Sequence, residues 1–228
     1  DIFPESDMLP VFNSHAIESC LHLIPGLSEH FIYFNDDVML AAEVNKYDFF
    51  TRAGQPKIRL SPSQYVLEKK PDINDIPTNW AAFNANQHIY NTFGFTFSRK
   101  TKHVPHPLRK SILQEMENKF KADFERTRRT RFRSKTDIAI PSMFFPYYSL
   151  ASGQAVNEKN VALEYIYIDS GKINDLRKLK LITTKNPKFI CINATRFREI
   201  SIERQHEIIT DFLNKRYPIK SPYEKDSD

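Results

Sequence analysis

The chain has 228 residues, 40% hydrophobic and 13% aromatic, with 33 Lys and Arg against 28 Asp and Glu residues and a formal net charge of +5. This composition excludes a disordered chain, and no apolar run reaches the roughly 18 residues that a membrane-spanning helix needs. The five glycines are scattered, which excludes a dinucleotide-binding turn and a phosphate-binding P-loop, because both need clustered glycines. Any phosphate must therefore be bound by side chains, a metal ion or helix ends.

The first forty residues alternate helix and strand signals. Residues 15–23 are predicted to form a short helix, with Asn13 or Ser14 as its cap. Residues 31–34 are aromatic and β-branched and predict a strand, which resumes at residues 38–40 after a polar interruption.

The next part of the chain is rich in breakers. Residues 51–79 hold four prolines and are predicted to be irregular. Residues 79–90 are predicted to be helical, and residues 98–105 to form a basic connector.

The clearest helix signal follows this connector. Apolar residues recur at every fourth position from Leu108 to Phe124, which describes one face of a helix. Pro107 suits the first helical position, where a missing N–H removes no hydrogen bond. His106 is therefore expected at or next to the N-terminal cap.

The last third of the chain adds further strands and helices. Ser134 and Asp137 have the spacing of a capping box for another helix, which two following prolines would kink. Residues 165–169 and 188–193 predict strands, and residues 201–216 predict a last helix. Strands that alternate with helices favour an α/β core.

A chain of this length is expected to form one domain over residues 1–228, with a frayed tail at 221–228. Cys20 and Cys191 are the only cysteines, and neither lies in a C-x-x-C spacing. We therefore expect two core thiols in a reducing compartment.

Basic residues concentrate between residues 99 and 135, a segment that holds thirteen Lys and Arg residues and four acidic residues. Such a segment indicates an anionic partner, whether nucleic acid, anionic lipid or a phosphorylated substrate, although a solvated face explains a charge run equally well. Phe132 is the one aromatic residue in its Arg-rich part, so a stacking platform for single-stranded nucleic acid is not supported.

Asp36 and Asp37 follow the first predicted strand. Two carboxylates at this place need solvent, a partner or a metal ion. Oxygen-rich clusters suit Mg²⁺ or Mn²⁺, which can hold the diphosphate of a nucleotide. A tight turn explains the same two residues equally well.

His103, His106 and Arg109 surround the expected start of the long helix. Free N–H groups and the positive end of the helix dipole make such a start a natural anion site. A histidine there could act as an acid or a base near neutral pH, while a plain cap is the alternative for His106. The Arg-rich run that ends at Arg133 offers a second anion-binding group, because the guanidinium fork matches phosphate oxygens.

Taken in order, these segments resemble the Stealth family of sugar-phosphate transferases, and the resemblance covers nearly the whole chain. The family includes bacterial capsule polymerases and the animal N-acetylglucosamine-1-phosphotransferase that tags lysosomal enzymes. Residues 9–38 resemble its second sequence block. Residues 93–95, 103–109 and 132–137 resemble the third block, and residues 189–193 with Tyr217-Pro218 resemble the fourth.

The resemblance implies transfer of hexose-1-phosphate, N-acetylhexosamine-1-phosphate in particular, from a UDP-sugar to an acceptor sugar hydroxyl. The products are UMP and a phosphodiester-linked capsular polysaccharide, so the expected partners are a UDP-sugar and an anionic glycan, without nucleic acid. It also implies an α/β fold with a GT-A-like nucleotide-sugar transferase core and added helices. A bacterial enzyme of this kind is expected in the cytoplasm, with a peripheral contact at the inner face of the membrane.

The resemblance also implies catalytic roles. Asp36 and Asp37 would hold Mg²⁺ or Mn²⁺ on the diphosphate, with Asp37 as the direct ligand. Arg133 would clamp the transferred phosphate. His106 is the first candidate for the general base on the acceptor hydroxyl, and His103 is the second.

Further residues are expected around the substrate. Arg109 would assist the phosphate clamp, and Asn13, Ser14 and Asn193 would line the pocket. Asp137 would cap its helix or orient the clamp.

The chain departs from the family pattern in two places. The first block, a strand that reads like V-Y-T-W-V-D, is absent, so we expect either a fragment or a strand supplied from elsewhere. The Asn-Asp of the fourth block is Asn193-Ala194 here, so the role of that carboxylate is lost or taken over. The alternative function is a catalytically incomplete module that binds an anionic phosphoglycan or a membrane surface through residues 99–135.

Overall fold

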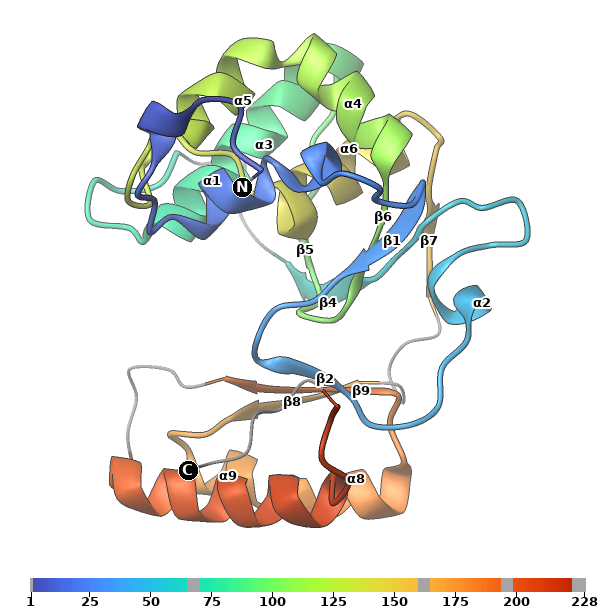
Figure 1. Ribbon diagram of the computed structural model, residues 1–228, viewed down its shortest axis with the longest axis vertical. Helices are drawn as coiled ribbons and strands as arrows, with labels where there is room; N and C mark the ends of the chain where they lie inside the picture. Colours follow the sequence, from blue (N-terminus) through green and yellow to red (C-terminus); the bar gives the residue numbers. More distant parts are fainter. Residues whose placement is uncertain (1, 65–69, 160–164, 194–198, 223–228) are drawn as a thin grey trace. The chain divides into compact units, whose positions relative to one another are not determined.

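The structure is a computed structural model that describes residues 2–64, 70–159, 165–193 and 199–222 (Figure 1). These residues form helices, small antiparallel sheets and parallel strand pairs, which confirms the predicted mixed α/β class. The GT-A-like core stays a prediction. The predicted tail lies largely outside the described residues, as does Ala194.

The chain divides into two compact units. The first unit consists of Asp1–Asn35 and Val44–Val161, and the second of Asp36–Glu43 and Ala162–Asp228. The division therefore falls directly before the predicted metal-binding carboxylates. Whether the two units act as one catalytic domain stays a prediction.

The first unit is rich in helices. Its helical elements are η1 (Ser6–Met8), α1 (Ser14–Glu18), η2 (Leu21–Leu23), α2 (Lys46–Phe49), α3 (Pro77–Phe93), α4 (Lys110–Lys119), α5 (Lys121–Arg128), the π-helical turn η3 (Ile140–Phe144) and α6 (Phe145–Ala151). Asn13 caps α1 as predicted, with its side chain accepting from the backbone N–H of His15. Helix α3 starts at a proline and ends at Gly94, whose φ of 79° is the left-handed conformation that favours glycine.

Three two-stranded sheets complete the first unit. They pair β1 (His30–Tyr33) with β6 (His106–Arg109), β4 (Leu60–Gln64) with β5 (Arg99–Thr101), and β3 (Lys57–Ile58) with β7 (Val156–Asn157). The helices α3, α4, α5 and α6 gather on one side of these strands (Figure 1). Their buried faces form one core, in which Phe97 stacks on Tyr147 with ring centroids 4.7 Å apart.

The second unit is a three-stranded sheet covered by helices. Its strands follow the order β2 (Val38–Leu40), β9 (Phe189–Asn193) and β8 (Tyr165–Asp169), and its helices are α7 (Ile173–Leu176), α8 (Leu179–Lys185) and α9 (Ile202–Arg216). Helices α8 and α9 lie on the same face of the sheet (Figure 1). Ile168, Ile182 and Ile190 are fully buried in the core between them. The three predicted strands and the Ser201 cap of the last helix are confirmed.

The predicted helix from Pro107 is wrong at its beginning. His106–Arg109 form strand β6, whose register places Leu108 opposite Phe31 of β1, and α4 begins only at Lys110. His106 is therefore not at a helix N-terminus, and the helix-end anion site expected there does not exist. Pairing with β1 buries Leu108 completely, so tertiary packing overrides the local helical pattern. The pattern itself continues through α4 and α5, which meet at Phe120.

Other differences are smaller and local. The helix expected over 15–23 ends at Glu18 and continues as the turn η2. The segment 51–79, expected to be irregular, contributes the short strands β3 and β4, and the connector 98–105 contributes β5. Cys20 and Cys191 are free and fully buried, as predicted.

Candidate functional site

A buried carboxylate, Asp137, ties the loop after α5 to the beginning of α1. Its Oδ2 accepts hydrogen bonds from Asn13 Nδ2 at 2.9 Å and from the backbone N–H of Ser134 at 2.8 Å, and it lies 3.2 Å from His15 Nδ1. Its Oδ1 accepts from the hydroxyl of Thr130 at 2.9 Å. The side chain has no exposed surface. Two of these four partners, Asn13 and His15, lie more than 100 residues from Asp137 in the sequence, so the carboxylate joins two distant segments.

These donors fix the charge state of Asp137. Burial alone raises the pKa of a carboxyl, but hydrogen bonds from His15, Ser134, Asn13 and Thr130 lower the pKa of Asp137 below its usual range. The predicted capping box between Ser134 and Asp137 is only half formed, because Asp137 accepts from the backbone N–H of Ser134 but the hydroxyl of Ser134 accepts from the N–H of Thr136. The result is a turn at which no helix begins. Its effect is to hold the chain on either side of Arg133.

Arg133 lies on this loop with its side chain exposed. Its Nη2 donates to Ser14 Oγ at 2.8 Å, which brings together two residues predicted for one site from opposite ends of the first unit. Asn13 is fully buried, and its side-chain amide donates hydrogen bonds to Thr130 and Asp137. It therefore stabilises the loop of Arg133 from the protein interior. Its predicted place in the pocket lining is not supported by this burial.

Arg133 differs from its neighbours in its partner. Arg126 pairs with Asp123, Arg128 with Glu117, and Arg129 with Glu5 and Asp7. Arg133 bonds to a neutral hydroxyl. Three of the described arginines in the run are thus neutralised within the protein, whereas Arg131 and Arg133 are exposed and have no acidic partner among the described residues. Of these two, Arg133 is the one that contacts a residue predicted for the site.

Two phenylalanines flank this pair. Phe12 and Phe132 are 67% and 66% exposed, and their rings stack with centroids 5.5 Å apart and an interplanar angle of 16°. The backbone N–H of Phe12 donates to the carbonyl of Arg131 at 2.8 Å, which fixes the two segments side by side. Phe132 directly precedes Arg133, and Phe12 lies two residues before Ser14, so each ring of the exposed aromatic pair is close in sequence to one partner of the Arg133–Ser14 contact.

Glu18, the last residue of α1, was not predicted for the site. Its side chain is buried and accepts a hydrogen bond from the hydroxyl of Tyr33 at 2.9 Å. Burial raises the pKa of Glu18, while the charges of His15, Arg133 and His103 act in the opposite direction. Glu18 thus belongs to the same electrostatic environment as two predicted site residues. The signal available in the sequence was that Glu18 is the one acidic residue of the helix predicted over residues 15–23.

The two histidines of the third block differ sharply. His106 is buried in β6, opposite Tyr33, and burial together with the charges of His103 and Arg59 lowers its pKa to about 3. A histidine with this pKa is neutral and a weak base at physiological pH. His103 lies in the half-exposed loop before β6. The geometry therefore favours His103 over His106 as the base, which reverses the predicted order.

Arg109, expected to assist the phosphate clamp, is engaged elsewhere. Its Nε donates to Glu29 Oε1 at 2.9 Å, and the carboxylate of Glu29 also accepts from Ser111. Arg109 pairs with His30 at one end of the β1–β6 ladder, while His106 pairs with Tyr33 at the other. Arg109 therefore lies at the end of β6 away from Tyr33 and Glu18.

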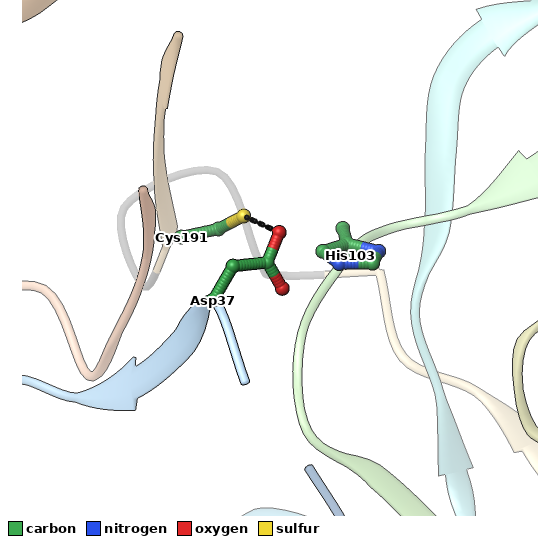
Figure 2. A group of neighbouring side chains, drawn as sticks. All are labelled: Asp37, His103 and Cys191. Carbon is green, nitrogen blue, oxygen red and sulfur yellow. Dashed lines mark hydrogen bonds between the residues drawn. The ribbon is translucent and has the colours of Figure 1, made fainter. Parts of the chain in front are cut away.

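Asp37 anchors a polar cluster in the second unit. Its Oδ2 accepts from Asn193 Nδ2 at 2.8 Å and from the thiol of Cys191 at 3.4 Å (Figure 2). Burial and the nearby charge of Asp37 raise the pKa of Cys191, so this thiol stays protonated and serves as a donor. The pairing of β2 with β9 makes the cluster, because it places Val38 opposite Cys191. Asp37 and Asn193, both predicted for the site, are thus brought together.

The donor atoms of this cluster fit a hard cation. Asp36 is exposed and Asp37 half-exposed, and the amide of Asn193 adds a carbonyl oxygen. Carboxylate and carbonyl oxygens are the ligands that Mg²⁺ and Mn²⁺ prefer. A protonated thiol is not a ligand for either ion, so Cys191 orients Asp37 and stays outside the ligand set. The residues present are therefore compatible with the expected metal.

A cavity of about 430 Å³ opens beside the two carboxylates. Apolar residues of β2, β9 and α9 line part of it, and its polar lining consists of Asp36, Asp37, Ser170, Gln205 and His206. Ser170 donates to Gln205 Oε1 at 3.1 Å, and Gln205 Nε2 donates to the backbone of the chain just before α9. This volume is typical of small-molecule sites.

Comparison with known families identifies three segments. Residues 1–58 match Stealth protein CR2, conserved region 2, residues 102–150 match Stealth protein CR3, conserved region 3, and residues 180–228 match Stealth protein CR4, conserved region 4. The three regions follow the order predicted from the sequence. They include the candidate residues on α1, β6, the Arg133 loop and β9.

Curated relatives match along the whole chain. Two exopolysaccharide phosphotransferases of Streptomyces coelicolor are 38% and 40% identical over 99% and 100% of this chain. The exopolysaccharide phosphotransferase CpsY of Mycobacterium tuberculosis is 36% identical over 99% of it. The chain spans only 38% of the length of the two Streptomyces proteins and 42% of that of CpsY. In the part of the chain that the structure describes, no helix is long and apolar enough to cross a membrane. With three consecutive conserved regions and these relatives, the chain belongs to the Stealth family.

Proposed function

We propose that the protein transfers hexose-1-phosphate from a UDP-sugar to a hydroxyl of an acceptor glycan. N-acetylhexosamine-1-phosphate is the group to be tested first. The observation that carries this proposal is the contact between Arg133 and Ser14. It presents a guanidinium with a neutral partner, on a loop held by a buried carboxylate. Membership of the family and the names of the relatives support sugar-phosphate transfer in polysaccharide synthesis.

In this proposal, Arg133 binds the oxygens of the transferred phosphate. Charge develops on these oxygens during phosphoryl transfer, and a preorganised guanidinium stabilises it at a fixed position. Asp137 holds the loop, so Arg133 does not have to be ordered when the substrate binds. The bond to Ser14 is exchanged for a bond to the phosphate.

His103 is proposed as the general base that takes the proton of the acceptor hydroxyl. It is the more accessible of the two candidate histidines, and its neighbour His106 is held neutral by burial. Glu18 is proposed as a positioning residue. Its carboxyl interacts electrostatically with His103 and Arg133, and Tyr33 fixes its orientation.

Asp37 and Asp36 are proposed to hold Mg²⁺ or Mn²⁺ just before the beginning of β2. When bound, such an ion would neutralise charge on the diphosphate of the donor. Asn193 and Cys191 orient Asp37 for this task through their hydrogen bonds. The cavity beside these carboxylates offers space for part of the donor.

The test measures UMP release by the whole protein from UDP-N-acetylglucosamine and UDP-N-acetylgalactosamine, with Mg²⁺ and an anionic glycan acceptor. Arg133→Ala and Asp37→Ala are expected to lower turnover by about 100-fold or more, because each removes transition-state charge stabilisation. Arg126→Ala is the matched control, since Arg126 is an exposed arginine of the same run that is paired with Asp123. Turnover by the two site variants at the rate of the control would refute these assignments.

A binding module without catalysis is the competing outcome of the same test. It would bind the glycan in a salt-sensitive manner, release no UMP and ignore a chelator. The ion pairs of Arg126, Arg128 and Arg129 speak against it, because they neutralise much of the basic run through which it would bind.

A further inference from the structure

A second cavity lies in the first unit, and its lining includes none of the residues to which a role is proposed above. It has a volume of about 540 Å³, within the range of small-molecule sites. Residues of strand β1 line one part of it, and residues of α2 and of the turn that follows α2 line the other. Its chemistry is set by His30, Lys46, Tyr47, Phe50 and Arg52.

The rim of this cavity is fixed before any ligand binds. Helix α2, which carries Lys46 and Tyr47, begins with a capping box in which Asn45 and Asp48 satisfy each other's backbone N–H groups. The turn that carries Arg52 is closed by backbone hydrogen bonds from Thr51 to Gln55 at 2.9 Å and from Gly54 to Thr51 at 3.0 Å. Lys46 and Arg52 therefore lie on short elements that are held by hydrogen bonds.

The floor of the cavity is equally constrained. His30 Nε2 lies 3.0 Å from the carbonyl oxygen of Gly54, and the ring of His30 meets the edge of Phe50 at a centroid distance of 5.0 Å. Gly54 has a φ of 79°, and a Cβ at this position would lie 2.8 Å from His30 Nε2. Only glycine permits this close approach of the turn to β1.

The electrostatic character of the cavity is positive. Lys46 stands 5.2 Å from the ring centroid of Tyr47, and neither Lys46 nor Arg52 has a carboxylate partner among the described residues. The two acidic residues that directly adjoin lining residues in the sequence are occupied, because Glu29 binds Arg109 and Ser111, and Asp48 closes the capping box. Aromatic rings and two cations without counter-charges together suit a ligand that has both an apolar face and a negative charge.

We propose that this cavity binds a phosphorylated sugar unit of the acceptor glycan, away from the end that reacts. The proposal rests on the function proposed above, which makes a phosphodiester-linked glycan both acceptor and product. Arg52 and Lys46 bind the phosphodiester oxygens, and the rings of Tyr47 and Phe50 contact the C–H face of a sugar, whose hydrogens meet the negative face of an aromatic ring.

The position of the cavity along β1 agrees with this role. The cavity is lined by His30, Phe31 and Ile32, and the same strand ends at Tyr33, which binds Glu18. Three residues along a strand span about 10 Å. A glycan seated in the cavity is thus about one or two sugar-phosphate units from Tyr33, within the same unit of the protein.

The test is titration calorimetry of the whole protein in the presence of a chelator, so that turnover is suppressed. The probe is a tetramer of N-acetylglucosamine joined by phosphodiesters. The comparison ligands are the neutral tetramer joined by glycosidic bonds and inorganic phosphate. We expect the anionic tetramer to bind about tenfold or more tightly than either, because it alone offers both charge and sugar faces.

Variants then locate the binding site. Arg52→Ala and Lys46→Ala are each expected to weaken binding of the anionic tetramer by about tenfold, as removal of a charge-assisted hydrogen bond predicts. Arg52→Lys should keep most of the affinity. Lys121→Ala is the control, because Lys121 is an exposed lysine on α5, 75% accessible and away from the cavity. In turnover assays, Arg52→Ala should raise the KM for the tetramer and leave kcat unchanged.

The outcomes separate the two proposals. An unchanged affinity in both Arg52→Ala and Lys46→Ala, or a neutral tetramer that binds as tightly as the anionic one, would overturn the assignment of the cavity. Loss of binding to vesicles of anionic phospholipid in Arg52→Ala, with unchanged glycan affinity, would overturn it in favour of a membrane surface. Failure of the wild type to release UMP, with the expected binding pattern intact, would refute the transferase function and leave the glycan site standing.

Discussion

Two buried carboxyl groups lie at the two ends of helix α1, and their pKa values are shifted in opposite directions. At the beginning of the helix, Asp137 accepts four hydrogen bonds and has a lowered pKa. At its end, Glu18 accepts one from Tyr33 and has a raised pKa. Both side chains are removed from solvent. The number of donors therefore decides their protonation behaviour, and burial alone does not.

This difference in pKa indicates a structural role for Asp137 and a role in the reaction for Glu18. A carboxylate with all its oxygens satisfied is locked in its charged form and serves to hold Arg133 in place. A carboxyl with one donor and three positively charged or titratable neighbours has a raised pKa, and perturbed pKa values of this kind are typical of functional groups. Asp137 should thus matter for stability, and Glu18 for activity.

The largest expected effect is on stability. Asp137→Ala leaves Asn13, the backbone N–H of Ser134 and His15 without their buried acceptor, so we expect a loss of about 3 to 5 kcal/mol in the free energy of unfolding. Urea unfolding followed by the fluorescence of Trp80, the one tryptophan of the chain, reports on the unit that holds both carboxylates. Asp137→Asn, which keeps an acceptor oxygen, should lose less. A loss below about 1 kcal/mol in Asp137→Ala would contradict the supporting role.

The second effect is on activity. Glu18→Gln keeps the shape of the side chain and its acceptor for Tyr33, but removes the charge that acts on His103 and Arg133. We expect turnover to fall by about 100-fold, in the range of acid–base contributions, with little change in the urea midpoint. Steady-state UMP release at saturating donor gives the measurement. Wild-type turnover in this variant would assign Glu18 to support, like Asp137.

The third prediction concerns pH. The raised pKa of Glu18 contributes stability that is complete below its ordinary value of 4.5 and is lost as the pH rises through the folded-state pKa. The lowered pKa of Asp137 has the reverse effect, so its contribution is complete above the ordinary value of 3.8 and is lost as the pH falls through the folded-state pKa. Compared with the wild type, Glu18→Gln should therefore lose less stability as the pH rises above 4.5. Urea titrations at several pH values test this, and parallel curves would contradict it.

The smallest effect is expected from Tyr33→Phe, which removes the single donor to Glu18. The lost hydrogen bond should lower the free energy of unfolding by about 1 kcal/mol and raise the pKa of Glu18 further. The pH at which activity depends on Glu18 should shift upward. An unchanged pH profile of kcat would indicate that Tyr33 does not control this carboxyl.

Local patterns made much of the fold predictable. The aromatic run at 31–34, the apolar run ending at Asn193 and the caps at Asn13 and Ser201 each signal their element within a few residues. The strand at His106–Arg109 was missed because it exists only through pairing with β1, more than 70 residues earlier. The sequence shows the helical period of the residues that follow, but it gives no local sign of the pairing with β1.

The sequence suggested which residues belong to the candidate site, but it did not show which of their side chains are in contact. Arg133, Ser14 and Asp37 were identified through the resemblance, which orders the blocks along the chain without stating which side chains touch. The contact of Asp137 with Asn13 spans 124 positions, and no local pattern predicts it. The exposure that separates His103 from His106, and the burial of Glu18, likewise arise only when β1, β6 and α1 come together.

The central claim is that a phosphate moves together with the sugar. The most direct test is to identify the nucleotide and the linkage formed when the whole protein acts on a UDP-N-acetylhexosamine with an anionic glycan acceptor and Mg²⁺. Chromatography distinguishes UMP from UDP, and phosphorus NMR detects a new phosphodiester. The account predicts UMP and one phosphodiester for each turnover. Release of UDP with no new phosphodiester would contradict it, because the sugar would then have been transferred without its phosphate.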